Sequence, residues 1–204
     1  MLRVKICGIT RPEDAVAAAE AGADAIGLVF YPKSRRGVSP EQAEAILAAL
    51  PPFVTPVALF VNEEVERIRA ICQGLGVRTV QLHGDEPPEV ARELAPLAVI
   101  KAFRVGSPDD LKALEGYPAS AYLLDARVEG KYGGTGRSFD WRLAAAARRH
   151  GRIIVAGGLT PENVAEAVRL ARPYGVDASS GVESAPGVKD RAKMAAFVAA
   201  ARGA

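Results

Sequence analysis

Short apolar runs alternate along this chain with longer stretches in which apolar and polar residues recur at helical spacing. The short runs are rich in Val and Ile, which favours strands, and the stretches between them are polar or rich in Ala, which favours helices. Eight runs are long enough to be strands: Leu2–Ile6, Ala25–Phe30, Thr55–Phe60, Thr79–Leu82, Val99–Phe103, Ala121–Leu124, Ile153–Ala156 and Val176–Ala178. The pattern therefore predicts eight strand–helix units.

Helix-start signals follow four of these strands. Thr10, Ser39, Ser107 and Thr160 each stand one or two residues before a Pro, and an acidic residue follows that Pro. A hydroxyl at the N-cap, Pro in the first turn and a carboxylate near the positive helix end all stabilise a helix N-terminus. We expect helices to begin at these four points. The remaining helices are predicted over Glu63–Gln73, Pro88–Leu94, Asp140–His150 and Asp190–Ala201.

Eight such units in a chain of 204 residues favour a closed parallel barrel. No long linker or change of composition divides the chain, so residues 1–204 are expected to form one catalytic domain. Right-handed crossovers and the need of each strand for two neighbours are both satisfied by closure. An open doubly wound sheet is the alternative, but it usually carries a GxGxxG loop after its first strand, and Cys7-Gly-Ile-Thr-Arg-Pro is not one. The predicted fold is α/β, a single (β/α)8 TIM barrel.

Composition and charge narrow the function classes. The 26 basic and 24 acidic side chains are spread along the chain, and no basic run resembles a nucleic-acid patch. No apolar run approaches the roughly 18 residues of a membrane span, and the N-terminus lacks the features of a signal peptide. We therefore expect a cytoplasmic protein that binds neither nucleic acid nor membrane. Its two cysteines, Cys7 and Cys72, have neither the number nor the spacing of a disulfide scaffold or a CxxC site.

The residues at which the predicted strands stop carry most of the candidate chemistry, because barrels of this kind build their sites at the carboxyl ends of the strands. These residues include no His and carboxylate cluster at ligand spacing, so no metal is expected. Gly157-Gly158 and Ser180-Gly181 would expose backbone N–H groups after the last two strands, where many barrels hold a phosphate. A phosphorylated small molecule is the expected ligand, and two ordinary tight turns are the alternative.

Eight segments, in order along the chain, resemble the phosphoribosylanthranilate isomerase family. They are VKICGIT (4–10), FYPKSRRGVSP (30–40), VALFVN (57–62), VQLHGDE (80–86), IKAFRV (100–105), LLDARVEGKYGGTGRSFDW (123–141), VAGGLTPENV (155–164) and DASSGVESAPGVKD (177–190). Together they reach nearly every predicted strand end. Arg35 departs from the family, whose members often have Pro there, but the neighbouring Arg36 keeps the family's anion-binding position.

The resemblance implies a cofactor-free isomerase of tryptophan biosynthesis. The implied reaction is an Amadori rearrangement of N-(5'-phosphoribosyl)anthranilate to 1-(2-carboxyphenylamino)-1-deoxyribulose 5-phosphate. An acid must protonate the ring oxygen and a base must take the proton from C2'. The resemblance assigns the acid to Asp125 and the base to Cys7. A thiol with an ordinary pKa near ~8.5 is a poor base at neutral pH, so nearby cations are expected to favour the Cys7 thiolate.

Further residues are implied in substrate binding. Arg36 is expected to bind the anthranilate carboxylate, for which a planar guanidinium with two donors is suited. Gly134 and Gly136 belong to a glycine-rich loop that is expected to hold the phosphate or cover the substrate. Gln81 and His83 share one face of the fourth strand, so they either line the pocket or form a polar network under it.

Two other functions stay open at this point. Lys5 and Lys101 lie within strands, where an inward lysine could form a Schiff base as in aldolases, although Lys5 is expected to pair with Asp177 instead. The second alternative is a non-catalytic phosphate-binding barrel. Cys72, on a predicted helix, is expected to be structural. The many apolar residues and short loops also lead us to expect a homodimer.

Overall fold

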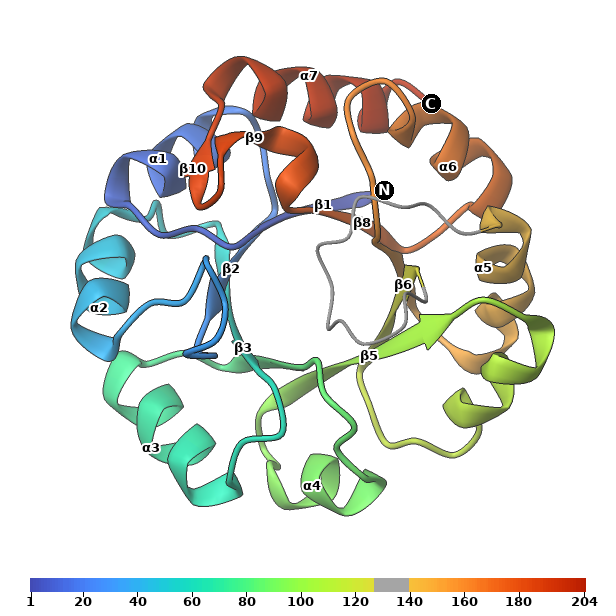
Figure 1. Cartoon of the computed structure of the whole chain (residues 1–204), viewed down its shortest axis with the longest axis horizontal. Coiled ribbons are helices and arrows are strands. Elements are labelled where there is room, and N and C mark those ends of the chain that lie inside the picture. Colours follow the sequence, from blue (N-terminus) through green and yellow to red (C-terminus); the bar gives the residue numbers. More distant parts are fainter. Residues whose placement is uncertain (127–139) are drawn as a thin grey trace.

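The computed structural model describes residues 1–126 and 140–204, and its strands form a closed barrel inside a ring of helices (Figure 1). All neighbouring strands of the barrel are parallel, and β1 pairs with β8 to close it. The predicted barrel is therefore confirmed. Its strands are β1 (Arg3–Cys7), β2 (Ala25–Val29), β3 (Thr55–Phe60), β4 (Thr79–Leu82), β5 (Ala98–Val105), β6 (Ala121–Ala126), β7 (Ile153–Val155) and β8 (Gly175–Ala178).

The helices lie outside the barrel and follow the strands in chain order (Figure 1). They are α1 (Pro12–Glu20), α2 (Pro40–Ala49), α3 (Val65–Leu75), α4 (Pro88–Glu93), α5 (Trp141–Ala147), α6 (Val164–Ala171) and α7 (Arg191–Arg202), with the short 3-10 helices η1 (Pro108–Leu114), η2 (Arg148–His150) and η3 (Ser180–Val182). Within the described ranges, none of them has the length and apolar character that crossing a membrane requires. The sequence did not predict the two-stranded hairpin of β9 (Glu183–Ala185) and β10 (Val188–Lys189).

Ser39 and Ser107 lie at the N-caps of α2 and η1, as the sequence predicts, and each makes a local side-chain contact there. The Ser39 hydroxyl accepts a hydrogen bond from the Gln42 backbone N–H, and the Gln42 side chain accepts one from the Ser39 N–H. This reciprocal pair satisfies two backbone donors at the start of α2. At η1, the Asp110 carboxylate accepts hydrogen bonds from the Ser107 N–H and hydroxyl, at 2.8 and 3.0 Å.

The other two expected N-caps are wrong. The N-cap of α1 is Arg11, and the Thr10 hydroxyl instead donates to the carbonyl oxygen of Gly187, 2.6 Å away. The N-cap of α6 is Asn163, whose side-chain oxygen accepts from the Thr160 N–H at 2.8 Å. In both cases the loop continues past the hydroxyl residue before the helix begins, so its oxygen does not reach the first turn.

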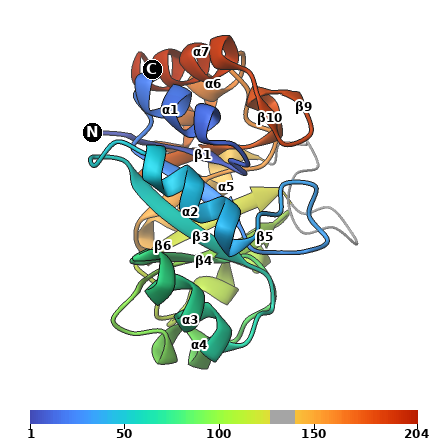
Figure 2. The same cartoon turned by 90° about the vertical axis from the view of Figure 1, so that its left-hand side faces the viewer.

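Strand side chains alternate between two environments. Those that point outward, such as Val4 and Ile6 of β1, are fully buried under the helices. Those that point inward fill the barrel, and nearest the strand carboxyl ends they include Cys7, Val29 and Leu59. Figure 2 shows that the hairpin β9–β10 lies at this end of the barrel and the N-terminus at the other. The inward residues at the carboxyl ends are therefore the ones available to a ligand.

Candidate active site

Most of the sequence-predicted residues meet at the carboxyl ends of the strands. Cys7 is the last residue of β1, Asp125 is the second-last residue of β6, and Arg36 lies between β2 and α2. Gln81 and His83 lie in and just after β4, Gly157 and Gly158 follow β7, and Ser180 and Gly181 follow β8. Gly134 and Gly136 lie outside the described residues.

Cys7 is buried inside the barrel beside two lysines. A Cβ added at Gly27 of the neighbouring strand would lie only 2.7 Å from the Cys7 Sγ, so glycine makes room for the sulfur. Burial raises the pKa of the Cys7 thiol, and the positive charges of Lys5 and Lys189 act against that rise. The cations have the expected sign, but burial outweighs them, so the pKa of the thiol is raised, contrary to the expectation that the thiolate is favoured.

Lys5 and Asp177 form an ion pair across the seam between β1 and β8. Their Nζ and Oδ1 atoms are 3.0 Å apart and both side chains are buried, as the sequence predicts. Burial raises the pKa of Asp177, and the negative charge of Asp125 adds to this rise. Since the charge of Asp177 also raises the pKa of Cys7, both Cys7 and Asp125 lie within electrostatic reach of Asp177.

Neither lysine of the Schiff-base alternative is without a partner. Burial lowers the pKa of Lys5, but the nearby charges of Asp177 and Cys7 more than offset this, so its pKa is raised. Lys101 Nζ donates to the Glu86 carboxylate at 2.6 Å and to the Gly84 carbonyl oxygen at 2.8 Å. Burial outweighs Glu86 and lowers the pKa of Lys101, but its side chain is only 4% exposed and both acceptors hold its ammonium. An amine that attacks a carbonyl must be neutral and accessible, so the ion pair opposes the first condition for Lys5, and burial opposes the second for both lysines.

Asp125 is linked to β4 through His83. The Asp125 Oδ2 lies 3.5 Å from His83 Nε2, and His83 Nδ1 lies 2.8 Å from Gln81 Nε2. Gln81 is fully buried, and its Oε1 has no hydrogen-bond partner among the described residues. Gln81 therefore fits the expected polar network under the pocket. His83 is partly exposed at the rim and fits a residue that lines the pocket.

Arg36 is held by a carboxylate that the sequence analysis missed. Its Nε and Nη2 donate to the two oxygens of Glu183, at 2.7 and 2.8 Å. Lys189 Nζ donates to the same carboxylate at 2.8 Å. Burial raises the pKa of Glu183, but hydrogen bonds from Arg36 and Lys189 outweigh it and leave the pKa lowered. Both residues lie in the segment 177–190, but nothing in its pattern marks them as partners of a loop 147 residues away.

The two glycine turns touch each other. Gly157 and Gly158 have φ angles of 79° and 67°, a region in which L side chains are strained. A Cβ added at Gly181 would lie 2.0 Å from the Leu159 carbonyl oxygen, so the turn after β8 packs directly on the turn after β7. Asn163, to which no role was assigned, donates from Nδ2 to the Gly158 carbonyl oxygen at 2.9 Å and holds this turn.

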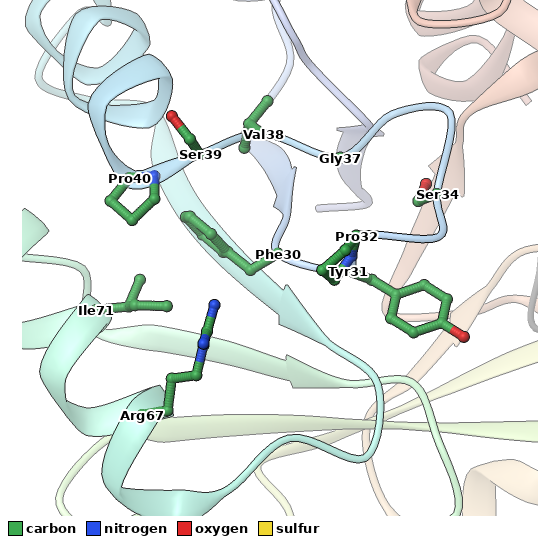
Figure 3. Close-up of a pocket in the computed structure, with 10 residues that line it drawn as sticks. All are labelled: Phe30, Tyr31, Pro32, Ser34, Gly37, Val38, Ser39, Pro40, Arg67 and Ile71. Carbon is green, nitrogen blue, oxygen red and sulfur yellow. The ribbon is translucent and has the colours of Figure 1, made fainter.

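A separate hollow lies outside the barrel, between the loop after β2 and helix α3 (Figure 3). Its volume is about 350 Å³, and Phe30, Arg67 and Ile71 are among its lining residues. None of the sequence-predicted site residues lines it. Within the described part of the chain, no group of three or more His, Cys, Asp or Glu side chains is arranged to hold a metal ion.

Comparison with known proteins agrees with this geometry. Residues 4–200 match the family described as N-(5'phosphoribosyl)anthranilate (PRA) isomerase. A relative of that name from Trichlorobacter lovleyi is 54% identical over 199 residues, which are 97% of each chain. The crystal structure of phosphoribosyl anthranilate isomerase from Thermotoga maritima is 45% identical over all of both chains, with a TM-score of 0.93.

Two further solved structures bear on assembly and ligand. One shows monomers that were generated from the dimeric phosphoribosylanthranilate isomerase of Thermotoga maritima. It is 43% identical over all of both chains, with a TM-score of 0.90. The other is a phosphoribosyl anthranilate isomerase in complex with reduced 1-(o-carboxyphenylamino)-1-deoxyribulose 5-phosphate, 45% identical over all of both chains, with a TM-score of 0.90. Matched over almost its whole length, this chain belongs to the N-(5'-phosphoribosyl)anthranilate isomerase family.

Proposed function

We propose that this chain isomerises N-(5'-phosphoribosyl)anthranilate with Cys7 as general base and Asp125 as general acid. Family membership establishes the isomerase activity and its place in tryptophan biosynthesis, and the residue roles are the proposal. One observation carries it: a buried thiol and a buried carboxyl lie at the active end of the same barrel, both within electrostatic reach of Asp177. Residues 1–204 would act as one cytoplasmic catalytic domain.

Asp125 would act in the first step. It donates its proton to the furanose ring oxygen, the bond from that oxygen to C1' breaks, and the electron pair of the anthranilate nitrogen forms a C1'=N double bond. His83 Nε2, 3.5 Å from Asp125 Oδ2, is a neighbour with which the carboxyl can exchange a proton. Gln81 would contribute by holding His83 rather than by touching the substrate, since it is fully buried.

Cys7 would act in the second step. Its thiolate takes the proton from C2', the electrons of the C2'–H bond form a C1'=C2' double bond, and the C1'=N electrons return to the nitrogen. The resulting enolamine then tautomerises to the ketone product. Lys5 and Lys189 support this role because both positive charges act to lower the pKa of the thiol against the effect of burial.

The substrate would be held at both ends. Gly157, Gly158, Ser180 and Gly181 form two contacting turns whose backbone can approach a phosphate closely, and a relative has been solved with a phosphorylated product analogue. At the other end Arg36 would bind the anthranilate carboxylate. Glu183 accepts from the Nε N–H and from one N–H of Nη2, whereas Nη1 and the second N–H of Nη2 have no hydrogen-bond partner among the described residues.

The assignment is tested with Cys7→Ala, Asp125→Asn and the double variant. Freshly generated phosphoribosylanthranilate is added and the loss of its fluorescence is followed. The kcat of each single variant should fall by a factor of roughly 10² to 10⁴, the usual contribution of a general acid or base. Binding of the reduced product analogue should persist.

Cys72→Ala is the control, because Cys72 lies buried in α3, where burial raises its pKa to about 11. Full turnover by the double variant would favour the non-catalytic barrel.

We also propose that the protein is a homodimer. A similar enzyme is called dimeric, and Phe53, in the loop before β3, is 98% exposed in the isolated chain. Burial of this ring against a second copy would be favourable, by roughly 1.5–3 kcal/mol for a fully buried Phe side chain. Sedimentation at micromolar concentration should give twice the mass of one chain, and a single monomer species would contradict the proposal.

A further inference from the structure

The hairpin β9–β10 is fastened to the segment that follows the base-bearing strand. Its two strands pair antiparallel, with Glu183 opposite Lys189. At the turn of the hairpin, the Gly187 carbonyl oxygen accepts a hydrogen bond from the Thr10 hydroxyl, at 2.6 Å. The backbone N–H of Lys189 donates to Asp14 Oδ2 of α1, at 3.1 Å. Both views place the hairpin beside α1 (Figures 1 and 2). These contacts hold the two charged side chains of the hairpin at the mouth of the barrel.

Glu183 lies between two cations there. Its carboxylate receives both Nε and Nη2 of Arg36 and also the Lys189 ammonium, and its side chain is only 6% exposed. The Arg36 side chain crosses Gly8, the residue after Cys7, so closely that a Cβ at Gly8 would lie 2.5 Å from Arg36 Cδ. The guanidinium is thus held on the Cys7 side of the barrel mouth, in one orientation.

We infer that Glu183 is a positioning residue that fixes the orientation in which Arg36 meets the carboxylate of the substrate. The inference rests on the proposed function, in which Arg36 binds that carboxylate. By taking the Nε N–H and one N–H of Nη2, Glu183 leaves the edge formed by Nη1 and the second N–H of Nη2 for the carboxylate of the ligand. Lys189 balances the charge of Glu183, so the group of three keeps a net charge of about +1 and still attracts an anion.

Glu183→Gln tests this through substrate preference. The Michaelis constant is measured for N-(5'-phosphoribosyl)anthranilate and for N-(5'-phosphoribosyl)aniline, the same molecule without the ring carboxylate. For the carboxylated substrate KM should rise on the order of tenfold, with a smaller change in kcat, as expected when a charge-assisted contact made in both ground and transition states is weakened. For the aniline compound KM should change little. Glu183→Asp should restore part of the preference.

Two further variants separate the inference from the proposed function. Arg36→Met should remove the preference for the carboxylated substrate, and adding Glu183→Gln to it should have no further effect on that preference. Glu86→Gln breaks another buried ion pair, with Lys101 at 2.6 Å, and serves as the control: it should lower stability but keep the preference.

The outcomes are distinct. If Arg36→Met removes the preference and Glu183→Gln keeps it, Glu183 does not position Arg36, and the inference is overturned while the role of Arg36 stands. If Arg36→Met itself keeps the preference, the proposed carboxylate contact is wrong and the inference falls with it. Should Glu183→Gln fail to fold, Glu183→Met, which also removes the carboxylate, provides the same comparison, and an unchanged preference there overturns the inference.

Discussion

Cys7 lies among charges that come from several elements of the fold. Lys5 from β1, Asp177 from β8, Lys189 from β10 and Arg36 from the loop after β2 all interact with it electrostatically. The net effect of burial and these charges is a raised thiol pKa. Because the positive charges of Lys5 and Lys189 act to lower this pKa, each of them increases the fraction of Cys7 that is thiolate at a given pH.

This environment predicts the pH dependence of the enzyme. The proposed base must be deprotonated, so the rising limb of kcat/KM should extend into the ordinary thiol range near ~8.5 or beyond it. Lys189→Met removes a cation that lowers the pKa of Cys7. The rising limb of the kcat/KM profile should therefore lie at higher pH in this variant than in the parent protein. Lys112→Met, at an exposed site on η1, should leave the limb in place. A limb that stays put or moves to lower pH in Lys189→Met would contradict this role.

At the scale of elements, the proposed phosphate end of the site depends on two turns that pack on each other. The turn after β7 is shaped by glycines with positive φ and held by Asn163. The turn after β8 approaches it so closely that Gly181 has no space for a side chain. Each turn therefore restricts the conformation of the other.

Gly181→Ala should separate these turns. Its Cβ would lie 2.0 Å from the Leu159 carbonyl oxygen, and backbone on both sides must move. We expect a loss of stability of about 1–3 kcal/mol, as for other overpacked sites, together with weaker binding of the phosphorylated substrate. Gly74→Ala is the matched control, because nothing lies within 4 Å of a Cβ at that position in α3. It should be neutral or stabilising by up to about 1 kcal/mol. Urea denaturation measures the stability of both variants, and KM for the phosphorylated substrate measures their binding.

At the scale of the whole molecule, closure of the barrel joins the first strand to the last. Lys5 and Asp177, 172 residues apart in the chain, lie opposite each other in the register of β1 and β8 and form their ion pair there. Both side chains are buried, so each charge depends on the other to offset the loss of water. The seam of the barrel thus also carries the charges that surround Cys7.

Asp177→Asn should therefore destabilise the fold by about 3–5 kcal/mol, because it leaves the Lys5 ammonium buried without a counter-charge. Replacing both residues, as Lys5→Met with Asp177→Leu, should recover most of that loss, since no buried charge remains. Glu89→Gln breaks an exposed pair with Arg92 and should change stability by less than about 1 kcal/mol. Urea unfolding of the four proteins provides the comparison. If Asp177→Asn costs no more than Glu89→Gln, the buried pair is not a structural element of the seam.

The sequence by itself determined the barrel and the family. The period of apolar residues is a local property, so the positions of the eight strands could be predicted within two residues at every end, and β3 and β4 without error. The parity of side chains along a strand is local too, which is why the inward pairing of Lys5 with Asp177 was predictable once closure was assumed. Motifs at the strand ends identified the family and hence the reaction.

Only the tertiary structure decided how the site residues are held. The hairpin β9–β10 brings Glu183 and Lys189 to Arg36 through contacts between distant parts of the chain, and no local pattern encodes such a contact. The same reason explains why Thr10 bonds Gly187 rather than capping a helix. The raised pKa of Cys7 likewise required coordinates, because it is a balance between burial and charges on separate elements, and the sequence shows which charges exist but not their distances.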